Sequence, residues 1–286
     1  MPMPKAAVVQ LTSAPDVQTN LDNVRRLLEQ ARDQGAVLAA LPENFAIMGR
    51  NENEKLAVAE PLGEGPIQSF LATTARELGL WIVAGTIPIR SERVPGKVAA
   101  AELVFDARGA LAARYDKIHL FDVDLPGREE RYRESATIAA GETPVVVDTP
   151  IGRLGLAVCY DLRFPELFRG LLARGAQVFC LPSAFTAPTG LAHWEVLIRA
   201  RAIENLCYVL APAQWGRHAS DRETYGDSMI VHPWGDVLDR KREGVGLAIA
   251  DIDLSVQSEL RERFPCVTHR RLALSAPSDQ PLTANR

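Results

Sequence analysis

The sequence lacks the features that define several classes of protein. No stretch approaches the roughly 18 apolar residues of a membrane-spanning helix, and residues 1–5 lead into a strand-like run where a secretory signal would have an apolar core. The five histidines show neither HxH nor HExxH spacing, so no metal site is expected. The four cysteines include no CxxC pair, which indicates reduced thiols instead of a disulfide framework. These absences predict a soluble, cytoplasmic protein.

A strongly positive or strongly negative net charge is also missing. The formal net charge is −4 over 286 residues, which argues against nucleic acid or an anionic membrane as the main partner. No Gly-, Ser- or Pro-rich linker and no short-period repeat divides the chain. With 47% hydrophobic residues, it can bury a sizeable core. We expect one domain over residues 1–272 and a polar C-terminal tail over residues 273–286.

Hydrophobic periodicity predicts strands that alternate with helices in both halves of the chain. Expected strands cover residues 5–11, 37–41, 81–89, 98–105, 111–117, 144–148, 153–158, 178–181, 208–213, 228–232, 237–240 and 247–252. Expected helices begin near Asp16 and at residues 66, 164, 193 and 254, and residues 117–141 read as a long irregular loop. Two mixed sheets packed face to face, or one doubly wound sheet, would satisfy this α/β pattern.

Cys159 is the strongest candidate for a reactive residue. It directly follows the small and apolar residues 155–158, which end the expected strand 153–158. A helical pattern begins shortly after it, with Pro165 where a missing backbone N–H costs nothing. This predicts a strand-to-helix elbow, where the N–H groups and dipole of the next helix favour a thiolate over a thiol. The alternative is an ordinary buried cysteine, but the Tyr, Asp, Arg and Glu around Cys159 count against it.

Glu43 and Lys117 occupy the same kind of position as Cys159, just beyond the carboxyl end of a strand. Loops at that edge of an α/β sheet are free to carry functional side chains. A thiol nucleophile needs a base, a donor for the developing oxyanion and a route to protonate the leaving group. Glu43 can be the base and Lys117 the fixed positive charge. Taken singly, each is more simply a solvated residue at the edge of a sheet; only the three together indicate a catalytic site.

Three motifs carry a resemblance to a known family. They are Leu-Pro-Glu at 41–43, Tyr-Asp-Lys-Ile-His-Leu at 115–120 and Val-Cys-Tyr-Asp-Leu-Arg-Phe-Pro-Glu-Leu at 158–167. In combination they resemble the nitrilase superfamily of carbon–nitrogen hydrolases, over residues 5 to about 272. The resemblance implies a four-layer α-β-β-α sandwich of two mixed sheets and hydrolysis of an amide through a cysteine thioester, with no metal or organic cofactor.

The resemblance also implies a role for each catalytic residue. Glu43 would be the general base, Lys117 the stabiliser of the transition state and Cys159 the nucleophile. The family often has a second glutamate near the lysine, and Glu134 stands at the matching position. The alternative for Glu134 is a salt bridge with a neighbouring arginine of its loop, at 131 or 133. The backbone N–H of Tyr160 is expected to help hold the oxyanion.

Further motifs resemble the Nit subgroup of this superfamily. They are Pro-Ser-Ala-Phe at 182–185, His-Trp-Glu at 193–195 and Ala-Gln-Trp-Gly-Arg-His at 213–218. The subgroup implies deaminated glutathione as substrate, cleaved to 2-oxoglutarate and Cys-Gly. The alternatives are 2-oxoglutaramate, the substrate of ω-amidase, which lacks the 213–218 run, and simple aliphatic amides. Asp227 and His232 depart from the subgroup pattern, and either would leave substrate choice open if it lay near the pocket.

An anionic 2-oxo acid amide requires a cation beside the nucleophile. Arg163, on the expected elbow, is the best candidate for a carboxylate clamp, because the guanidinium fork matches a carboxylate. The alternative is that Arg163 pairs with Asp161 or Glu166. Phe185 and Thr189 follow a strand and are expected to wall the same pocket.

The expected partners are a small-molecule amide and a second copy of the chain. The expected helix 193–205 has an apolar face that includes Val196, Leu197, Ala200 and Ile203, which core packing explains. Because nitrilase relatives use this region to dimerise, we also expect a homodimer. Two other functions stay open: an N-acyltransferase that admits an amine in place of water, and a non-catalytic scaffold.

Overall fold

Two mixed β-sheets lie face to face in the computed structural model of this chain, which describes residues 3–125 and 130–272. The expected tail, residues 273–286, lies outside the described residues. The helices are α1 (Val17–Asp33), α2 (Glu54–Ala57), α3 (Pro66–Leu78), α4 (Pro165–Ala173), α5 (Ala187–Asn205) and α6 (Leu254–Arg263), with 3-10 turns at Glu134–Ala136 and Cys159–Arg163.

The first sheet has seven strands in the order β17-β1-β2-β3-β5-β4, with β6 paired to β5. Its strands are β1 (Lys5–Gln10), β2 (Ala36–Ala40), β3 (Trp81–Val83), β4 (Ile87–Arg90), β5 (Val98–Phe105), β6 (Leu111–Asp116) and β17 (Gly246–Asp251). β1, β2 and β3 run parallel, and the other pairings are antiparallel.

The second sheet has six strands in the order β16-β15-β12-β11-β10-β9. Its strands are β9 (Val146–Thr149), β10 (Gly152–Leu156), β11 (Val178–Cys180), β12 (Tyr208–Ala211), β15 (Ser228–Val231) and β16 (Val237–Lys241). β10, β11 and β12 are parallel, and α4 and α5 form the crossovers between them. Two small hairpins stand apart from the sheets: β7 (Asp122–Asp124) with β8 (Arg131–Arg133), and β13 (Trp215–Arg217) with β14 (Glu223–Tyr225).

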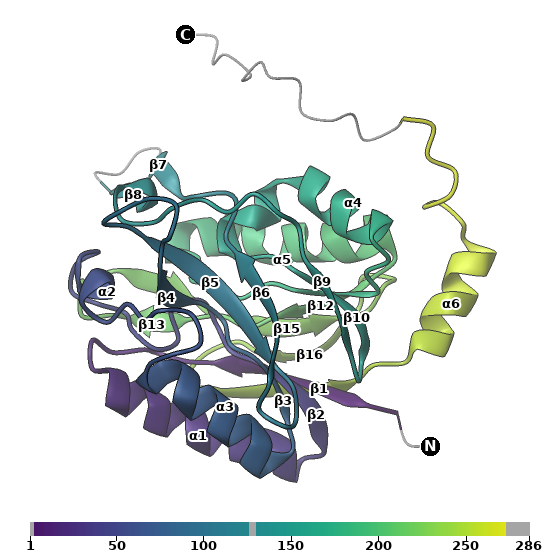
Figure 1. The fold of residues 1–286 in the computed structure, drawn as a ribbon. Helices are drawn as coiled ribbons and strands as arrows, with labels where there is room; N and C mark the ends of the chain where they lie inside the picture. Colours follow the sequence, from purple (N-terminus) through teal and green to yellow (C-terminus); the bar gives the residue numbers. More distant parts are fainter. Residues whose placement is uncertain (1–2, 126–129, 273–286) are drawn as a thin grey trace, which may run out of the picture.

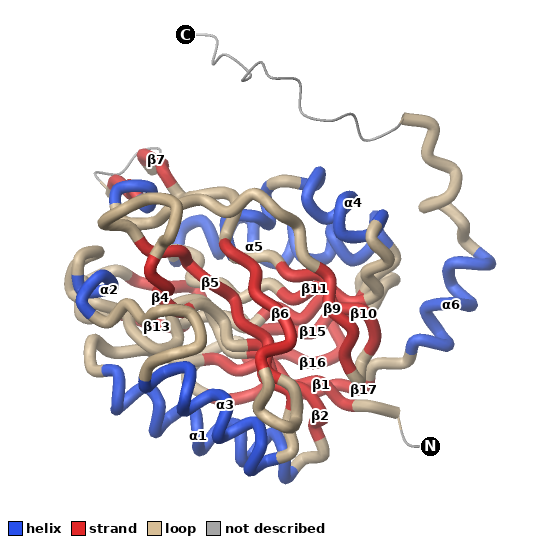
Figure 2. Tube along the Cα trace, in the orientation of Figure 1, coloured by secondary structure: helices blue, strands red, loops and turns tan. Residues whose placement is uncertain are grey.

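Four of the helices form the outer layers of the molecule, whereas α6 extends away from the sheets (Figures 1 and 2). α1 and α3 cover the outer face of the first sheet, and α4 and α5 cover the second. One apolar core joins the inner faces of both sheets and extends under α4 and α5, while a second core lies between the first sheet and α1 and α3. The predicted four-layer α-β-β-α sandwich is therefore confirmed. No helix of the described ranges is both long and apolar enough to cross a membrane.

Local sequence signals set several helix ends. Asp16 caps α1 by accepting a hydrogen bond from the backbone N–H of Thr19 (2.8 Å). Pro66 lies in the first turn of α3, and Gly79 ends that helix with φ of 61°, a left-handed conformation that glycine adopts at little cost. These ends were predicted from the sequence.

The expected strand 81–89 is wrong, because it is divided at Gly85. This glycine has φ of 53°, and a Cβ placed on it would lie 2.0 Å from the carbonyl oxygen of Pro42. The chain therefore turns between β3 and β4 where it passes the segment that follows β2. Only glycine permits this close contact with Pro42, and the contact supports the backbone next to Glu43.

Three other expectations need correction. The loop at 117–141 contains the β7–β8 hairpin and a 3-10 turn, and the β13–β14 hairpin was not predicted. Helix α5 begins at Ala187, six residues before the expected start, because Pro188 lies in its first turn. The face of α5 that packs on the sheet carries Trp194, Ile198 and Ala202, whereas Val196 and Ile203 are 69% and 44% exposed. Core packing therefore does not explain those two residues.

Candidate active site

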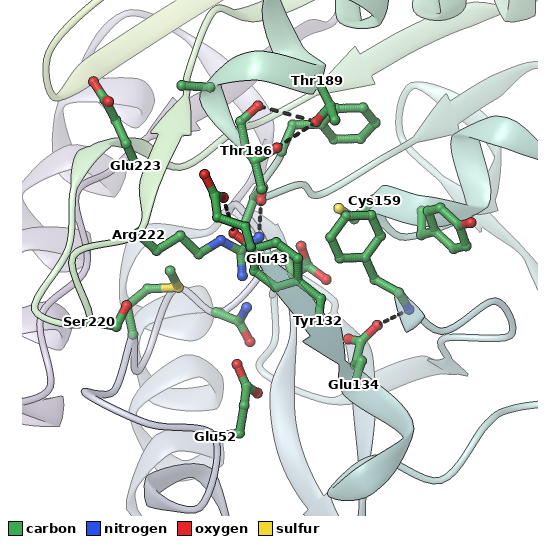
Figure 3. Close-up of a pocket in the computed structure, with 18 of the residues that line it drawn as sticks. Glu43, Glu52, Tyr132, Glu134, Cys159, Thr186, Thr189, Ser220, Arg222 and Glu223 are labelled. Atoms are coloured by element: carbon green, nitrogen blue, oxygen red, sulfur yellow. Dashed lines mark hydrogen bonds between the residues drawn. The ribbon is translucent and has the colours of Figure 1, made fainter. Parts of the chain in front are cut away.

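The candidate residues converge at one edge of the two sheets. Glu43 follows β2, Lys117 follows β6 and Cys159 follows β10, so the carboxyl ends of three strands deliver them. All three line one cavity of about 780 Å³, which Glu134 and Tyr160 also line. Figure 3 shows Glu43 near the centre of this cavity, with Cys159 and Glu134 on one side of it.

Backbone contacts hold Glu43 in place. The residue after it, Asn44, has φ of 57°, and its N–H donates to the hydroxyl of Thr86 (2.9 Å). The side-chain amide of Gln214 donates to the carbonyl oxygen of Glu43 (3.0 Å). Glu43 itself is only 4% exposed. Burial opposes its ionisation, but the ammonium of Lys117 more than offsets burial, so the pKa of Glu43 is lowered.

Lys117 connects two carboxylates. Its Nζ lies 2.8 Å from Glu43 and 2.9 Å from Glu134, and the residue is 1% exposed. Burial alone would lower the pKa of this amine, yet Glu134 and Glu43 together raise it well above its ordinary value. Lys117 is therefore a permanent cation that cannot serve as a base at neutral pH.

Glu134 contacts Lys117 and not the arginines of its own loop. Its second partner is the backbone N–H of Phe121, which donates to it at 2.7 Å. Arg131 and Arg133 instead pair with Asp124. The alternative interpretation of Glu134, a local salt bridge, is therefore wrong.

Cys159 stands on a sharp elbow. Its φ is 48°, a left-handed conformation that costs a non-glycine residue roughly 1–2 kcal/mol. Its backbone N–H donates to the carbonyl of Pro182 (2.9 Å). The carboxylate of Asp161 secures the turn by accepting from the N–H of Val158 (2.8 Å) and the hydroxyl of Tyr115 (2.7 Å).

The expected resting thiolate is a wrong prediction. Burial first, and the carboxylate of Glu43 second, raise the pKa of the Cys159 thiol well above its ordinary value, although Lys117 acts in the opposite sense. The sulfur is also separated from α4 by the 3-10 turn Cys159–Arg163. The helix dipole acts mainly within the first turn and does not overcome desolvation at this distance. The thiol therefore keeps its proton until a base removes it.

The expected substrate-binding residues also line the cavity. Arg163, Phe185 and Thr189 all face it. The guanidinium of Arg163 donates to Nδ1 of His193 (3.2 Å) and lies 5.3 Å from the ring centroid of Phe185. Within the described ranges Arg163 forms no ion pair, so the alternative of a pairing with a neighbouring acid is not found.

Sequence reasoning missed part of the cavity wall. Arg222 and Tyr132 contribute to it from two hairpins, β13–β14 and β7–β8, that periodicity did not reveal. Glu52 and Lys55 line it from the segment around α2, where they form an ion pair of 2.7 Å. The short strands of these hairpins carry no clear alternation, so no local signal marks these residues.

The two departures from the subgroup pattern lie outside this cavity. Asp227 pairs with Arg240, and its backbone carbonyl accepts from the indole N–H of Trp194 (2.8 Å). His232 accepts a hydrogen bond from the N–H of Trp234 (3.1 Å) and packs edge-on against Tyr208. Neither contacts the cavity, so neither bears on substrate choice directly.

Comparisons with known proteins agree with this geometry. The carbon-nitrogen hydrolase family model matches residues 5–262. The chain is 42% identical to deaminated glutathione amidase of Yersinia enterocolitica (94% of this chain, 93% of the relative) and 44% identical to that of Homo sapiens (98% and 86%). The crystal structure of Saccharomyces cerevisiae Nit3, described as a member of branch 10 of the nitrilase superfamily, superposes with a TM-score of 0.84 at 31% identity (94% and 97%). This chain therefore belongs to the carbon–nitrogen hydrolase family of the nitrilase superfamily and is an amidohydrolase.

Proposed function

We propose that this enzyme hydrolyses deaminated glutathione through a thioester on Cys159. The buried arrangement of Glu43, Lys117 and Cys159 carries the proposal. The ammonium of Lys117 lies between Glu43 and Glu134 and beside the thiol, in a cavity large enough for a small peptide-like amide. Two relatives above 40% identity bear that activity in their names, which supports the choice of substrate.

In the first step Glu43 acts as the base. Its carboxylate, whose pKa is lowered, takes the proton of the Cys159 thiol, whose pKa is raised, as the sulfur attacks the amide carbonyl carbon. A carbon–sulfur bond forms, and the carbonyl π electrons move to oxygen. The proton transfer coincides with the attack, so a reactive thiolate does not accumulate in the empty site.

Lys117 stabilises the oxyanion that forms. An ammonium has three N–H donors, and Glu43 and Glu134 accept two of them. The third is left for the developing negative charge, and the backbone N–H of Tyr160 is the second donor. Such fixed donors in a water-poor site contribute about 10²–10³-fold each to catalysis. Glu134 positions Lys117 and does not touch the reacting atoms.

The second half of the reaction reuses Glu43. The protonated Glu43 gives its proton to the amide nitrogen, the carbon–nitrogen bond breaks, and the amine leaves. Glu43 then takes a proton from water, whose oxygen attacks the thioester carbon. The carbon–sulfur bond breaks as the sulfur takes that proton, which restores the thiol and releases the acid.

Substrate choice is tested by a direct comparison. The purified chain is assayed with deaminated glutathione, 2-oxoglutaramate and acetamide at equal concentrations, with Cys159→Ala as the blank. We expect deaminated glutathione to have the highest kcat/KM. A clear preference for 2-oxoglutaramate would make the enzyme an ω-amidase, and transfer to added hydroxylamine in preference to water would make it an acyltransferase. Absence of an acyl adduct on Cys159 by intact mass would reject the thioester mechanism.

We also propose that residues 1–272 form the catalytic domain and that the enzyme works as a cytoplasmic homodimer. Leu191 and Val196 on α5 are 78% and 69% exposed, and Ile203 lies on the same helix. Large apolar side chains in this number on one helix favour burial against a second copy.

A further inference from the structure

The charges that line the active-site cavity are not all neutralised. Glu43 and Glu134 pair with Lys117, and Glu52 pairs with Lys55. Two cations of the wall, Arg163 and Arg222, form no ion pair within the described ranges. Arg163 was expected to hold a carboxylate. Arg222 has no role in the mechanism so far.

Arg222 is fixed in place, but no carboxylate of the described ranges forms a direct ion pair with it; Glu43 and Glu52 act on its charge only from a longer distance. One terminal N–H group donates to the carbonyl oxygen of Ala184, and the guanidinium carbon lies 5.2 Å from the ring centroid of Tyr132. Its Nε is shut off from water and has no hydrogen-bond partner in the part of the chain that the structure describes. The residue is half-buried, and a buried N–H donor without an acceptor is costly. An anion carried by a ligand would accept from the guanidinium and supply the direct ion pair that Arg222 lacks.

Ala184 fixes the distance between Arg222 and the nucleophile. The backbone N–H of Ala184 faces the sulfur of Cys159, and the carbonyl of the same residue faces Arg222. One residue and two hydrogen bonds therefore separate the guanidinium from the sulfur. The distance between the two groups is at most roughly 10 Å. A carboxylate at Arg222 would lie a few bonds from the carbon that the sulfur attacks.

Arg222 lies on the side of the cavity where the leaving amine must be. Figure 3 shows it reaching toward Glu43, whose ionised form it stabilises by charge. Glu43 gives its proton to the leaving nitrogen, so the leaving group lies next to Glu43. Arg163, by contrast, stands on the elbow with Cys159 and contacts Tyr160 and Phe185.

We propose that Arg222 is the specificity residue for the leaving group and binds a carboxylate carried on the amine side of the scissile bond. This rests on the proposed amidase function and extends it: the substrate is anionic at both ends, with Arg163 for the acyl side and Arg222 for the amine side. Amides that release a carboxylate-bearing amine, such as Cys-Gly, are then preferred over those that release a neutral amine or ammonia.

The test compares two substrates that differ only at the proposed contact. They are deaminated glutathione and its analogue with a C-terminal glycinamide, which releases a neutral-ended dipeptide. We expect the wild-type enzyme to prefer the carboxylate form by about 10- to 100-fold in kcat/KM, as for one charge-assisted hydrogen-bonded pair. Arg222→Gln should bring this ratio close to one, because it loses far more activity on the carboxylate form than on the glycinamide form. Arg222→Lys should keep part of the preference.

Two control variants separate this role from others. Arg217→Gln removes an exposed arginine of the same hairpin, which pairs with Asp221, and should leave the ratio unchanged. Arg163→Ala should lower kcat/KM for both substrates and also leave the ratio unchanged. A wild-type ratio near one, or an equal loss on both substrates in Arg222→Gln, would overturn the role of Arg222 while the amidase function stands. A wild-type enzyme inactive on both substrates would instead reject the proposed function.

Discussion

The pKa of Glu43 is lowered and that of Cys159 is raised. This pair of shifts predicts a change in thiol reactivity that a folding defect would not produce. Glu43 raises the pKa of the neighbouring thiol, whereas Lys117 lowers it. Glu43→Gln keeps the size of the side chain and removes its charge. The substitution should therefore abolish most of the activity and, at the same time, make the thiol more acidic.

The expected magnitudes follow from the position of Glu43. Because this residue transfers the proton in both half-reactions, kcat/KM should fall by about 10⁴-fold, the upper end for general acid–base catalysis and roughly 5 kcal/mol in activation free energy. The ammonium of Lys117 would then act on the sulfur with less opposition. Each unit by which the thiol pKa falls gives tenfold more thiolate at neutral pH, so alkylation of Cys159 should be faster in the variant than in the wild type.

The assay measures the rate of iodoacetamide alkylation of Cys159 between pH 6.5 and 10. It uses a Cys266→Ser background, because Cys266 is partly exposed while Cys180 and Cys207 are buried. Peptide mass mapping assigns the modified residue, and circular dichroism checks the fold. Slower alkylation and a higher thiol pKa in Glu43→Gln would show that the Glu43 carboxylate does not raise the pKa of Cys159. The proposed mechanism, in which Glu43 removes the proton of a neutral thiol, would then be wrong.

Three further predictions test separate parts of the structure. Glu134→Gln leaves Lys117 with one carboxylate, so kcat should fall by about 10- to 100-fold with KM little changed; a change in KM alone would contradict a positioning role. The raised pKa of Cys159 means that the native protein keeps a proton that the unfolded chain releases near pH 9. The unfolding free energy of the wild type should therefore fall relative to Cys159→Ser above that pH, by about 1.4 kcal/mol per pH unit in urea titrations, and parallel curves would refute this. Val196→Glu on α5 should give a monomer by light scattering, with the exposed-site variant Arg217→Gln as control.

The sequence determined the parts of this protein that depend on neighbouring residues. The elbow at Cys159, the ends of α1 and α3 and the parallel β-α-β units follow from apolar runs, caps and glycines within a few residues of each position. The motifs around Glu43, Lys117 and Cys159 were sufficient to identify the family. The subgroup motifs likewise pointed to relatives that the comparisons then found.

Only the tertiary structure decided the chemistry of the site. The thiol pKa depends on burial by both sheets and on a carboxylate 116 positions earlier in the chain, so a local rule about helix dipoles gave the wrong sign. Arg222 and Tyr132 enter the cavity from hairpins whose strands are too short to show periodicity. The break at Gly85 arises from a contact with Pro42, which no window of sequence contains. Desolvation and charge pairing are set by residues distant in sequence, and packing alone brings those residues together.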